Sequence, residues 1–362
     1  MSSPCKKSDI GYNIYMNIEY TGRLEKIEAV LEASLPQIVD ADWISDSFSF
    51  VPEAVRVAHI TPLVTPCRDL LLRGGKRWRP LLMVLSAELA GGGDRSYTLT
   101  PLVEFAHTAS LIHDDIEDSS DERRGKPAIH LIYGEDTAIN SASWLYFHAQ
   151  SVINSFPSSD FLKLLLQRVY SRELRRLHLG QAMDIHWHRD PVKIPVRSEY
   201  EAMVTLKTGT LSRMAGEIGL LSAGKDEGEA SEFGKVCARI GVGFQVLDDV
   251  RNLVSGNPGK KRGDDIVEGK KSLPLIMHLE KKQKDHGFIA DSLRRAQDEG
   301  ITSSAVEEVI GLLGSSGAIE QARLYGVQLI EQSCLTVRGR YPENPAAELI
   351  SGLFESMLQD PV

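Results

Sequence analysis

Two acidic clusters in the sequence could bind divalent cations. The first places Asp114, Asp115 and Asp118 at the end of an apolar run, and the second places Asp248 and Asp249 after another. If each run is helical, carboxylates three or four residues apart project from one face. Carboxylate oxygens suit Mg²⁺, which shares its coordination shell between protein, water and substrate phosphate. Two such clusters could together hold Mg²⁺ ions on a diphosphate.

Basic residues lie close to both acidic clusters, where a phosphate group would need them. Arginine offers phosphate a forked pair of donors, and lysine offers a mobile point charge. A single charged cluster is more often a solvated surface, but solvation does not explain why basic clusters adjoin metal-type carboxylates. The basic stretches are "GGKRWRP", "DERRGKP", "LKTGT" and "GKKRGDDIVEGKK", which contain Lys76, Arg79, Arg123, Arg124, Lys207, Lys260 and Lys270.

The elements that position these side chains are predicted to be helices. Apolar residues recur at three- and four-residue spacing, and alternating strand-like runs are nearly absent. Thr100 before Pro101 predicts that one helix begins there. We expect an all-α fold, with residues 51–362 as one large helical domain and residues 1–50 as a partly helical N-terminal extension. The clearest helical segments are residues 24–39, 79–90, 101–118, 160–185, 198–223, 232–250 and 303–313.

Composition and charge argue against several classes of protein. A chain of 362 residues with a formal net charge of −9 lacks the basic surface that broad nucleic-acid binding requires. Its four cysteines have neither disulfide-framework nor zinc-site spacing. We expect no secretory signal and no transmembrane helix, because no apolar run is long enough for either. A cytoplasmic protein is therefore expected.

Six ordered motifs between about residue 70 and residue 280 make the chain resemble the trans-isoprenyl diphosphate synthases of the polyprenyl synthetase family. They are "GGKRWRP", "DDIEDSSDERRGKP", "GQAMD", "KTG", "FQVLDD" and "GKKRGDDIVEGK". Within the family, "DDIED", "GQAMDIHW" and a second motif ending in Asn252 are most similar to geranylgeranyl diphosphate synthases. The resemblance implies a single helical bundle of the isoprenoid synthase type with a central active-site cavity, and a homodimer.

The resemblance also implies a reaction, the joining of isopentenyl diphosphate to a dimethylallyl, geranyl or farnesyl diphosphate. Asp114, Asp118 and Asp248 would hold Mg²⁺, about three ions with the bound diphosphate. Asp115 and Asp249 would support them. The other ligands of the allylic diphosphate would be Arg123, Lys207, Thr208, Gln245, Lys260 and Lys270. The ligands of isopentenyl diphosphate would be Lys76, Arg79, His107 and Arg124.

Product length is predicted from the size of the side chains beneath the first acidic cluster. Ala109 and Ser110 precede Asp114 by five and four residues, which is about one helical turn. In farnesyl-type relatives bulky residues near there block the growing chain, so two small residues favour geranylgeranyl diphosphate or a longer product. Candidate residues for the floor of the chain tunnel are Phe105, Trp144 and Phe147.

Three alternatives remain open. A longer-chain polyprenyl diphosphate synthase would share every motif. A class I terpene cyclase needs no isopentenyl diphosphate site, so "GGKRWRP" and "RRGKP" argue against it. A non-catalytic partner subunit should have lost ligands, whereas both acidic motifs persist. Within the two acidic motifs, only the third position of the second departs from the family pattern, where Asn252 removes one negative charge near the expected metals.

Overall fold

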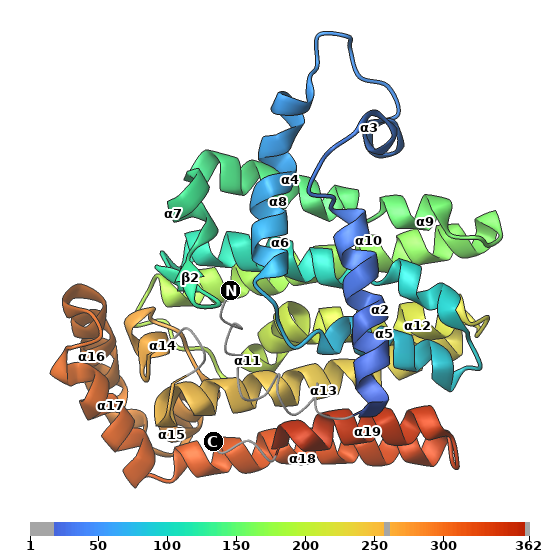
Figure 1. The fold of residues 1–362 in the computed structure, drawn as a ribbon. Coiled ribbons are helices and arrows are strands. Elements are labelled where there is room, and N and C mark those ends of the chain that lie inside the picture. Colours follow the sequence, from blue (N-terminus) through green and yellow to red (C-terminus); the bar gives the residue numbers. More distant parts are fainter. Residues whose placement is uncertain (1–17, 257–260, 359–362) are drawn as a thin grey trace. The chain divides into compact units, whose positions relative to one another are not determined.

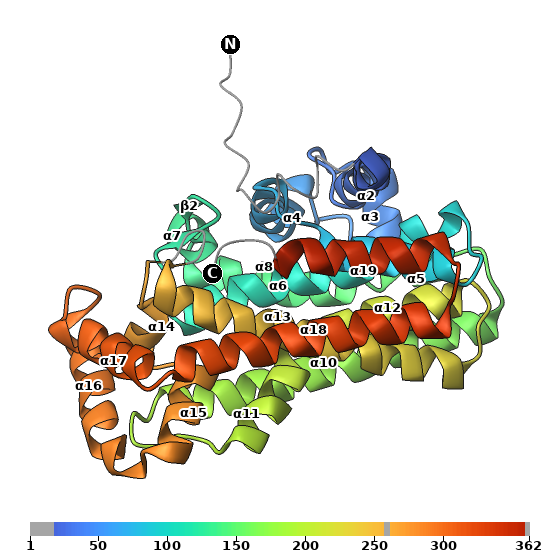
Figure 2. The same cartoon turned by 90° about the horizontal axis from the view of Figure 1, so that it is seen from below.

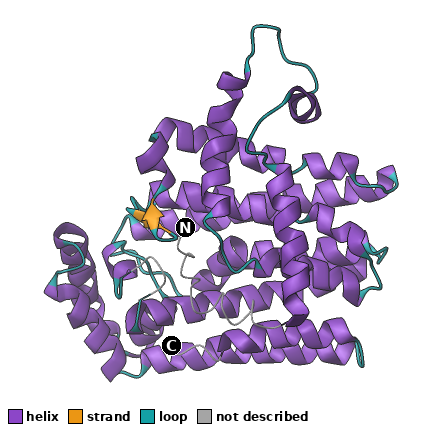
Figure 3. Ribbon diagram, in the orientation of Figure 1, coloured by secondary structure: helices purple, strands orange, loops and turns teal. Residues whose placement is uncertain are grey.

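The computed structural model describes residues 18–256 and 261–358, which are helical apart from loops and one short hairpin (Figures 1 and 3). Strands β1 (Glu122–Arg123) and β2 (Lys126–Pro127) pair antiparallel, Glu122 opposite Pro127. The helices and helical turns are α2 (Ile18–Ser34), α3 (Ala41–Phe48), α4 (Val57–Leu72), α5 (Trp78–Leu89), η1 (Asp94–Leu99), α6 (Pro101–Glu117), α7 (Ile129–Tyr133), α8 (Glu135–His148), α9 (Ser151–Ser155), α10 (Asp160–His188), α11 (Arg197–Val204), η2 (Thr205–Gly209), α12 (Thr210–Ser222), α13 (Glu227–Val254), α14 (Asp264–Val267), α15 (Leu273–Lys281), η3 (Gln283–Asp285), α16 (His286–Glu299), α17 (Ser304–Ser315), α18 (Ala318–Arg340) and α19 (Pro345–Leu358).

The chain divides into two compact units. The first spans Met1–Ser171 and Met214–Ala230, and the second spans Arg172–Arg213 and Ser231–Val362. The boundaries between them fall within α10, α12 and α13. In the described residues, no helix has both the length and the apolar character needed to cross a membrane.

In the first unit, α6 packs along α8, and α4 contacts both (Figure 1). Helix α6 begins at Pro101, as the sequence predicts. Helix α2 contacts α5 and α6, and its Leu24, Ile27 and Leu31 side chains are fully buried. Burying three such side chains stabilises the docking of α2 by about 5 kcal/mol. Much of the expected N-terminal extension is therefore part of the core of this unit.

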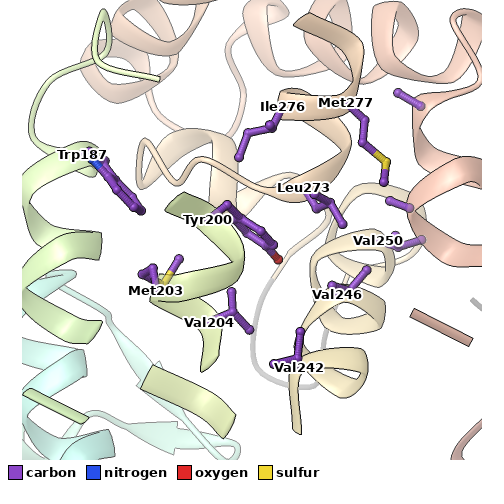
Figure 4. Packing of buried hydrophobic residues seen from close by; sticks show 12 residues of the cluster. Trp187, Tyr200, Met203, Val204, Val242, Val246, Val250, Leu273, Ile276 and Met277 are labelled. Atoms are coloured by element: carbon purple, nitrogen blue, oxygen red, sulfur yellow. The ribbon is translucent and has the colours of Figure 1, made fainter. Parts of the chain in front are cut away.

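In the second unit, α18 and α19 lie side by side (Figure 2), and an apolar cluster joins α10, α11, α13 and α15. Trp187, Tyr200, Val246 and Leu273 each come from a different one of these helices and lie in this cluster (Figure 4). Val246 and Val250 flank the second acidic motif along α13. The cluster thereby fixes the helices that carry the motifs of this unit.

Two helical features differ from the sequence pattern. Helix α4 has no segment among those predicted and contains Pro62 and Pro66, residues that ordinarily interrupt a helix. Its buried face against α8 sustains it, because tertiary packing outweighs local propensity. The segment predicted as one helix over residues 198–223 is helical throughout, but contains a π-helical turn at Thr205–Gly209.

Candidate active site

The first acidic motif lies at the carboxyl end of α6. Asp114 and Asp115 are in the last turn, and Asp118 caps the helix and donates its backbone N–H to the Asp114 carbonyl at 2.8 Å. Asp114 and Asp118 therefore lie on one face, both half-buried. The partial negative charge at this end of a helix disfavours nearby carboxylates, which a bound cation would offset.

Asp115 is turned toward the protein interior and pairs with Arg123. Its side chain is buried, and Arg123 Nε donates to Oδ1 at 2.8 Å. Burial raises the pKa of Asp115, although the hydrogen bond from Arg123 opposes the shift. Arg124 and Gly125, with φ of 56° and 74°, form the two-residue turn between β1 and β2. Asp115 thus anchors the hairpin that carries both arginines of "RRGKP".

Arg124 lies against the glycine-rich turn between α4 and α5. A Cβ atom at Gly75 would be 3.0 Å from the Arg124 guanidinium, so glycine leaves the room that this contact needs. Arg124 also donates to the Leu70 carbonyl at 3.1 Å. Burial, with the nearby cations, lowers the pKa of Arg124 to about 10, so the group remains charged at neutral pH.

Arg79 and His107 meet beside the same turn. Arg79 Nη1 lies 3.5 Å from His107 Nε2, and the Arg79 guanidinium lies 4.3 Å from the centre of the Trp78 ring. Burial, reinforced by the charges of Arg79 and Arg124, holds the pKa of His107 well below its ordinary value. The imidazole is therefore neutral, and its Nε2 faces Arg79 as an acceptor. Lys76 is half-buried in the same turn.

The second acidic motif lies within α13 of the second unit. Asp249 is buried and accepts hydrogen bonds from Tyr200 Oη at 2.6 Å, Gln245 Nε2 at 3.0 Å and Leu273 N at 3.2 Å. Burial raises its pKa to about 6, against the effect of these bonds. Asp248 is half-buried. Both oxygens of Asp249 therefore accept hydrogen bonds from within the protein, so Asp248 is the better placed of the two to bind a cation.

Asn252, at the third position of this motif, is fully buried. Its Oδ1 accepts from the Asp265 backbone N–H at 3.2 Å, and its carbonyl accepts from the Gly263 N–H at 2.9 Å. The sequence places this residue near the metals, whereas the structure assigns it to the segment after α13. The amide Nδ2 has no hydrogen-bond partner among the described residues, so the structure shows a role for the amide oxygen alone.

Lys207 and Thr208 lie in the π-helical turn η2. Thr208 Oγ1 donates to Gln245 Oε1 at 2.9 Å, and the amide of Gln245 in turn donates to Asp249. This chain of contacts links the "KTG" motif to the second acidic motif. Turns of this kind occur frequently at functional sites.

The "GQAMD" motif on α10 supports that turn from the other side. Gly180 lies so close to it that a Cβ atom would be 2.4 Å from the Lys207 backbone nitrogen. One helical turn further on, Asp184 Oδ2 pairs with Lys207 Nζ at 2.6 Å. The motif therefore holds both the backbone and the side chain of Lys207.

Lys260 and Lys270 are the last two lysines that the sequence predicts as diphosphate ligands. Lys270 Nζ pairs with Glu268 Oε2 at 2.6 Å. Lys260 lies outside the described residues. Lys271, which the sequence leaves without a role, is buried and donates to the Gly269 carbonyl at 2.5 Å.

The residues beneath the first acidic motif are small, as the product-length argument requires. Ala109 is buried, and Ser110 is half-buried and donates to the His107 carbonyl at 2.8 Å. One turn lower, the buried Phe105 stacks on His148 with ring centres 6.1 Å apart.

The candidate floor residues on α8 have different environments. Trp144 stacks on His148 with ring centres 4.5 Å apart, and Trp43 of α3 lies 5.4 Å from the same imidazole. The side chain of Phe147 is 73% exposed. The expectation that Phe147 forms a floor is therefore wrong, because a side chain that is open to solvent does not close an internal tunnel.

Two residues have a supporting role that the sequence does not predict. Tyr200 holds Asp249 from α11, 49 residues away. Arg77 belongs to the basic motif "GGKRWRP", yet it is buried and pairs with two glutamates. Neither contact could be inferred from spacing, because both depend on tertiary packing.

Residues 61–309 match the Polyprenyl synthetase family. The chain belongs to this family. It is 34% identical over 224 residues to "Geranylgeranyl pyrophosphate synthase paxG" of Penicillium paxilli, across 61% of this chain but only 57% of that protein. It is 33% identical over 273 residues to a geranylgeranyl pyrophosphate synthase of Eremothecium gossypii, across 72% of this chain and 83% of that protein.

The fold of this polyprenyl synthetase is shared with solved structures. A polyprenyl synthase of Caulobacter crescentus, described as complexed with calcium and isoprenyl diphosphate, superimposes with a TM-score of 0.77 over 99% of this chain and 100% of that one, at 23% identity. The predicted family, the all-α isoprenoid synthase fold and the prenyltransferase class are confirmed.

The carboxylates of this polyprenyl synthetase fit Mg²⁺ when substrate is bound with it. Within residues 18–256 and 261–358, no group of three His, Cys, Asp or Glu side chains could hold a metal ion by itself. Mg²⁺ needs no such group, since it usually takes roughly one or two carboxylates and completes its shell with water and phosphate. Asp114 with Asp118, and separately Asp248, are half-buried oxygen donors of this kind.

Proposed function

We propose that this polyprenyl synthetase condenses isopentenyl diphosphate with an allylic diphosphate to form geranylgeranyl diphosphate. The observation that supports the proposal is that the first unit contains two separate polar clusters, one of carboxylates and one of arginines. Asp114 and Asp118 on α6 are suited to a metal-bound diphosphate, whereas Arg79 and Arg124 beside the neutral His107 are suited to a diphosphate without metal. A synthase needs two diphosphate sites and a cyclase needs one, so this arrangement favours chain elongation.

The reaction breaks the C–O bond of the allylic diphosphate and forms a C–C bond to isopentenyl diphosphate, with loss of one proton to the departing pyrophosphate. Mg²⁺ held by Asp114, Asp118 and Asp248 would stabilise the leaving diphosphate. Asp115 and Asp249 would position the hairpin and the second motif. The side chains proposed to orient the allylic diphosphate are Arg123, Lys207, Thr208, Lys260 and Lys270, with Gln245 holding Thr208.

The second substrate would be bound in the first unit. Lys76, Arg79 and Arg124 would bind the diphosphate of isopentenyl diphosphate through charge-assisted hydrogen bonds. His107 is neutral, so it adds no charge and orients Arg79 through its Nε2. Together these side chains would hold the double bond of isopentenyl diphosphate toward the allylic cation. Their role would be to position the substrate and not to transfer a proton.

The resemblance further supports a homodimer with residues 51–362 as the catalytic domain. The net charge of −9 supports a protein that binds no nucleic acid, and we place it in the cytoplasm. Every proposed ligand lies in residues 51–362, while α2 and α3 belong to the residues before them. Sedimentation of the purified protein at several concentrations tests the dimer.

A product assay tests the proposed function. Labelled isopentenyl diphosphate, Mg²⁺ and each allylic starter in turn are incubated with the protein, and the products are separated by chain length. A ladder that ends at the twenty-carbon product supports the proposal, and a longer end point favours a longer-chain synthase. Pyrophosphate release without elongation would identify a cyclase. No reaction with any starter would contradict the proposal and leave the alternative of a non-catalytic partner subunit.

Replacing Arg79 with alanine is expected to weaken isopentenyl diphosphate binding selectively. Removal of a charge-assisted bond raises the KM for this substrate about tenfold or more, while the KM for the allylic starter changes little. Arg168→Ala provides the control, because its ion pair with Glu227 is exposed and long, at 3.7 Å. Equal increases in both KM values would reject the two-site assignment.

Ser110→Phe is expected to shorten the product. The larger side chain would fill space about one turn beneath Asp114, so the ladder should end one or more five-carbon units earlier, as measured by the same separation. Ser155→Phe, at the exposed end of α9, is the size-matched control. An unchanged product spectrum for Ser110→Phe would place the growing chain elsewhere.

A further inference from the structure

Arg77, at the centre of "GGKRWRP", is buried and uses its whole guanidinium within the protein. Nε donates to Glu28 Oε1 at 2.8 Å, Nη1 donates to Glu104 Oε1 at 2.6 Å, and Nη2 donates to the Leu71 carbonyl at 2.6 Å. Only 3% of the residue is exposed. Arg77 is therefore an internal anchor, unlike the half-buried Lys76 and Arg79 on either side of it.

The backbone of Arg77 shows how tightly this anchor is held. Its φ of 49° lies in the left-handed region, which is disfavoured for a residue with a side chain. Such a conformation persists where the surroundings fix it. Burial alone would lower the pKa of Arg77, but the carboxylates of Glu104 and Glu28 outweigh it and raise the pKa. The two carboxylates thus hold the charged side chain and, through it, the turn.

The anchored turn carries the proposed ligands of isopentenyl diphosphate. Glu104 and His107 are three residues apart on one face of α6, where Glu104 holds Arg77 and His107 contacts Arg79. Gly75 in the same turn lies against Arg124. A displacement of Arg77 would therefore move the groups that bind this one substrate.

Glu28 comes from a part of the chain beyond the family match, which begins at residue 61. Its helix α2 is fixed independently, by the burial of Leu24, Ile27 and Leu31 and by the Arg23–Glu88 ion pair at 2.7 Å. Glu28 therefore lies on a well-packed helix, from which its carboxylate pairs with Arg77 of the turn.

We propose that Glu28 is a positioning residue for isopentenyl diphosphate, which acts through Arg77 to hold the turn that carries Lys76 and Arg79. This inference rests on the proposed function. It also gives α2 a specific role, since no residue of this helix is among the proposed ligands. Without the Glu28 carboxylate, Arg77 keeps its contacts with Glu104 of α6 and with the Leu71 carbonyl of α4, but one of its two charged partners is lost.

The test is a comparison of Glu28→Gln with wild type in steady-state elongation. The KM for isopentenyl diphosphate should rise about tenfold, while the KM for the allylic starter and kcat at saturation stay within about twofold. Glu25→Gln is the matched control, because it makes the same charge change at an exposed position of α2. The Glu28 side chain is 27% exposed, so a folded variant is expected, and its melting temperature is measured.

The outcomes separate this inference from the proposed function. If wild type makes no elongated product, the proposed function fails. If wild type elongates but Glu28→Gln raises both KM values equally, or neither, Glu28 has no positioning role while the function stands. If Glu28→Gln does not fold, Glu28→Asp replaces it, since it keeps the charge but is one methylene shorter. An unchanged KM for isopentenyl diphosphate in a folded Glu28→Asp protein would then overturn the inference.

Discussion

Asp114→Ala is expected to lower turnover by about a hundredfold to a thousandfold while the protein stays folded. The loss follows from the proposed role of Asp114, which is to hold Mg²⁺ against the leaving diphosphate. Removing one group that stabilises the transition state electrostatically typically lowers kcat by a factor of about 10²–10³. The fold should survive, since the side chain is half-buried at the end of α6, where a negative charge is unfavourable without a bound cation. Steady-state elongation and thermal melting measure the two effects.

Glu117→Gln is the control for Asp114→Ala. Glu117 belongs to the same helical turn and carries the same charge, but its side chain is exposed and it is not among the proposed ligands. It should keep nearly full activity. If Asp114→Ala retained activity, or if both variants lost it equally, Asp114 would not be a metal ligand.

The helices that carry the motifs could be predicted because their apolar spacing is local. Thr100 and Pro101 signal the start of α6, and its apolar residues at three- and four-residue spacing continue into Asp114. That continuity is sufficient to infer that Asp114 and Asp118 share a face. The same reasoning cannot identify α4, where Pro62 and Pro66 contradict the helical pattern and packing against α8 compensates.

The partners of the motif residues could not be predicted, because they come from distant parts of the chain. Spacing cannot distinguish Asp114, which is half-buried, from Asp115, which is buried against Arg123. Nor can it show that Tyr200 takes up one oxygen of Asp249. Adjacent acidic residues look equivalent in sequence, but a helix turns by about 100° per residue, so one of each pair is directed inward.

The glycines of the motifs illustrate the same limit. The resemblance identifies Gly180 as the first residue of "GQAMD" but not its function. In the structure it marks the closest approach of α10 to η2, where the backbone of Lys207 takes the space of a side chain. Glycine in the middle of a helix usually lowers stability by about 0.5–1 kcal/mol relative to alanine. Gly180 is needed despite this cost, because its position has no room for a Cβ atom.

Gly180→Ala is therefore expected to impair both stability and activity. The new methyl group would lie 2.4 Å from the Lys207 nitrogen and 2.8 Å from its Cα, and these backbone atoms can move only if η2 moves. Overpacking of this kind costs about 1–3 kcal/mol. A displacement of Lys207 and Thr208 by about 1 Å should lower kcat about a hundredfold. Melting temperature and steady-state elongation measure the two losses.

Gly311→Ala in α17 is the matched control, because a Cβ atom there meets nothing within 4 Å. Alanine at that open helical position should raise the stability by about 0.5–1 kcal/mol and leave activity unchanged. The same substitution would then have opposite effects at two helical glycines of one unit. If Gly180→Ala were as stable and active as Gly311→Ala, the close approach of α10 to η2 would not be what holds Lys207 in place.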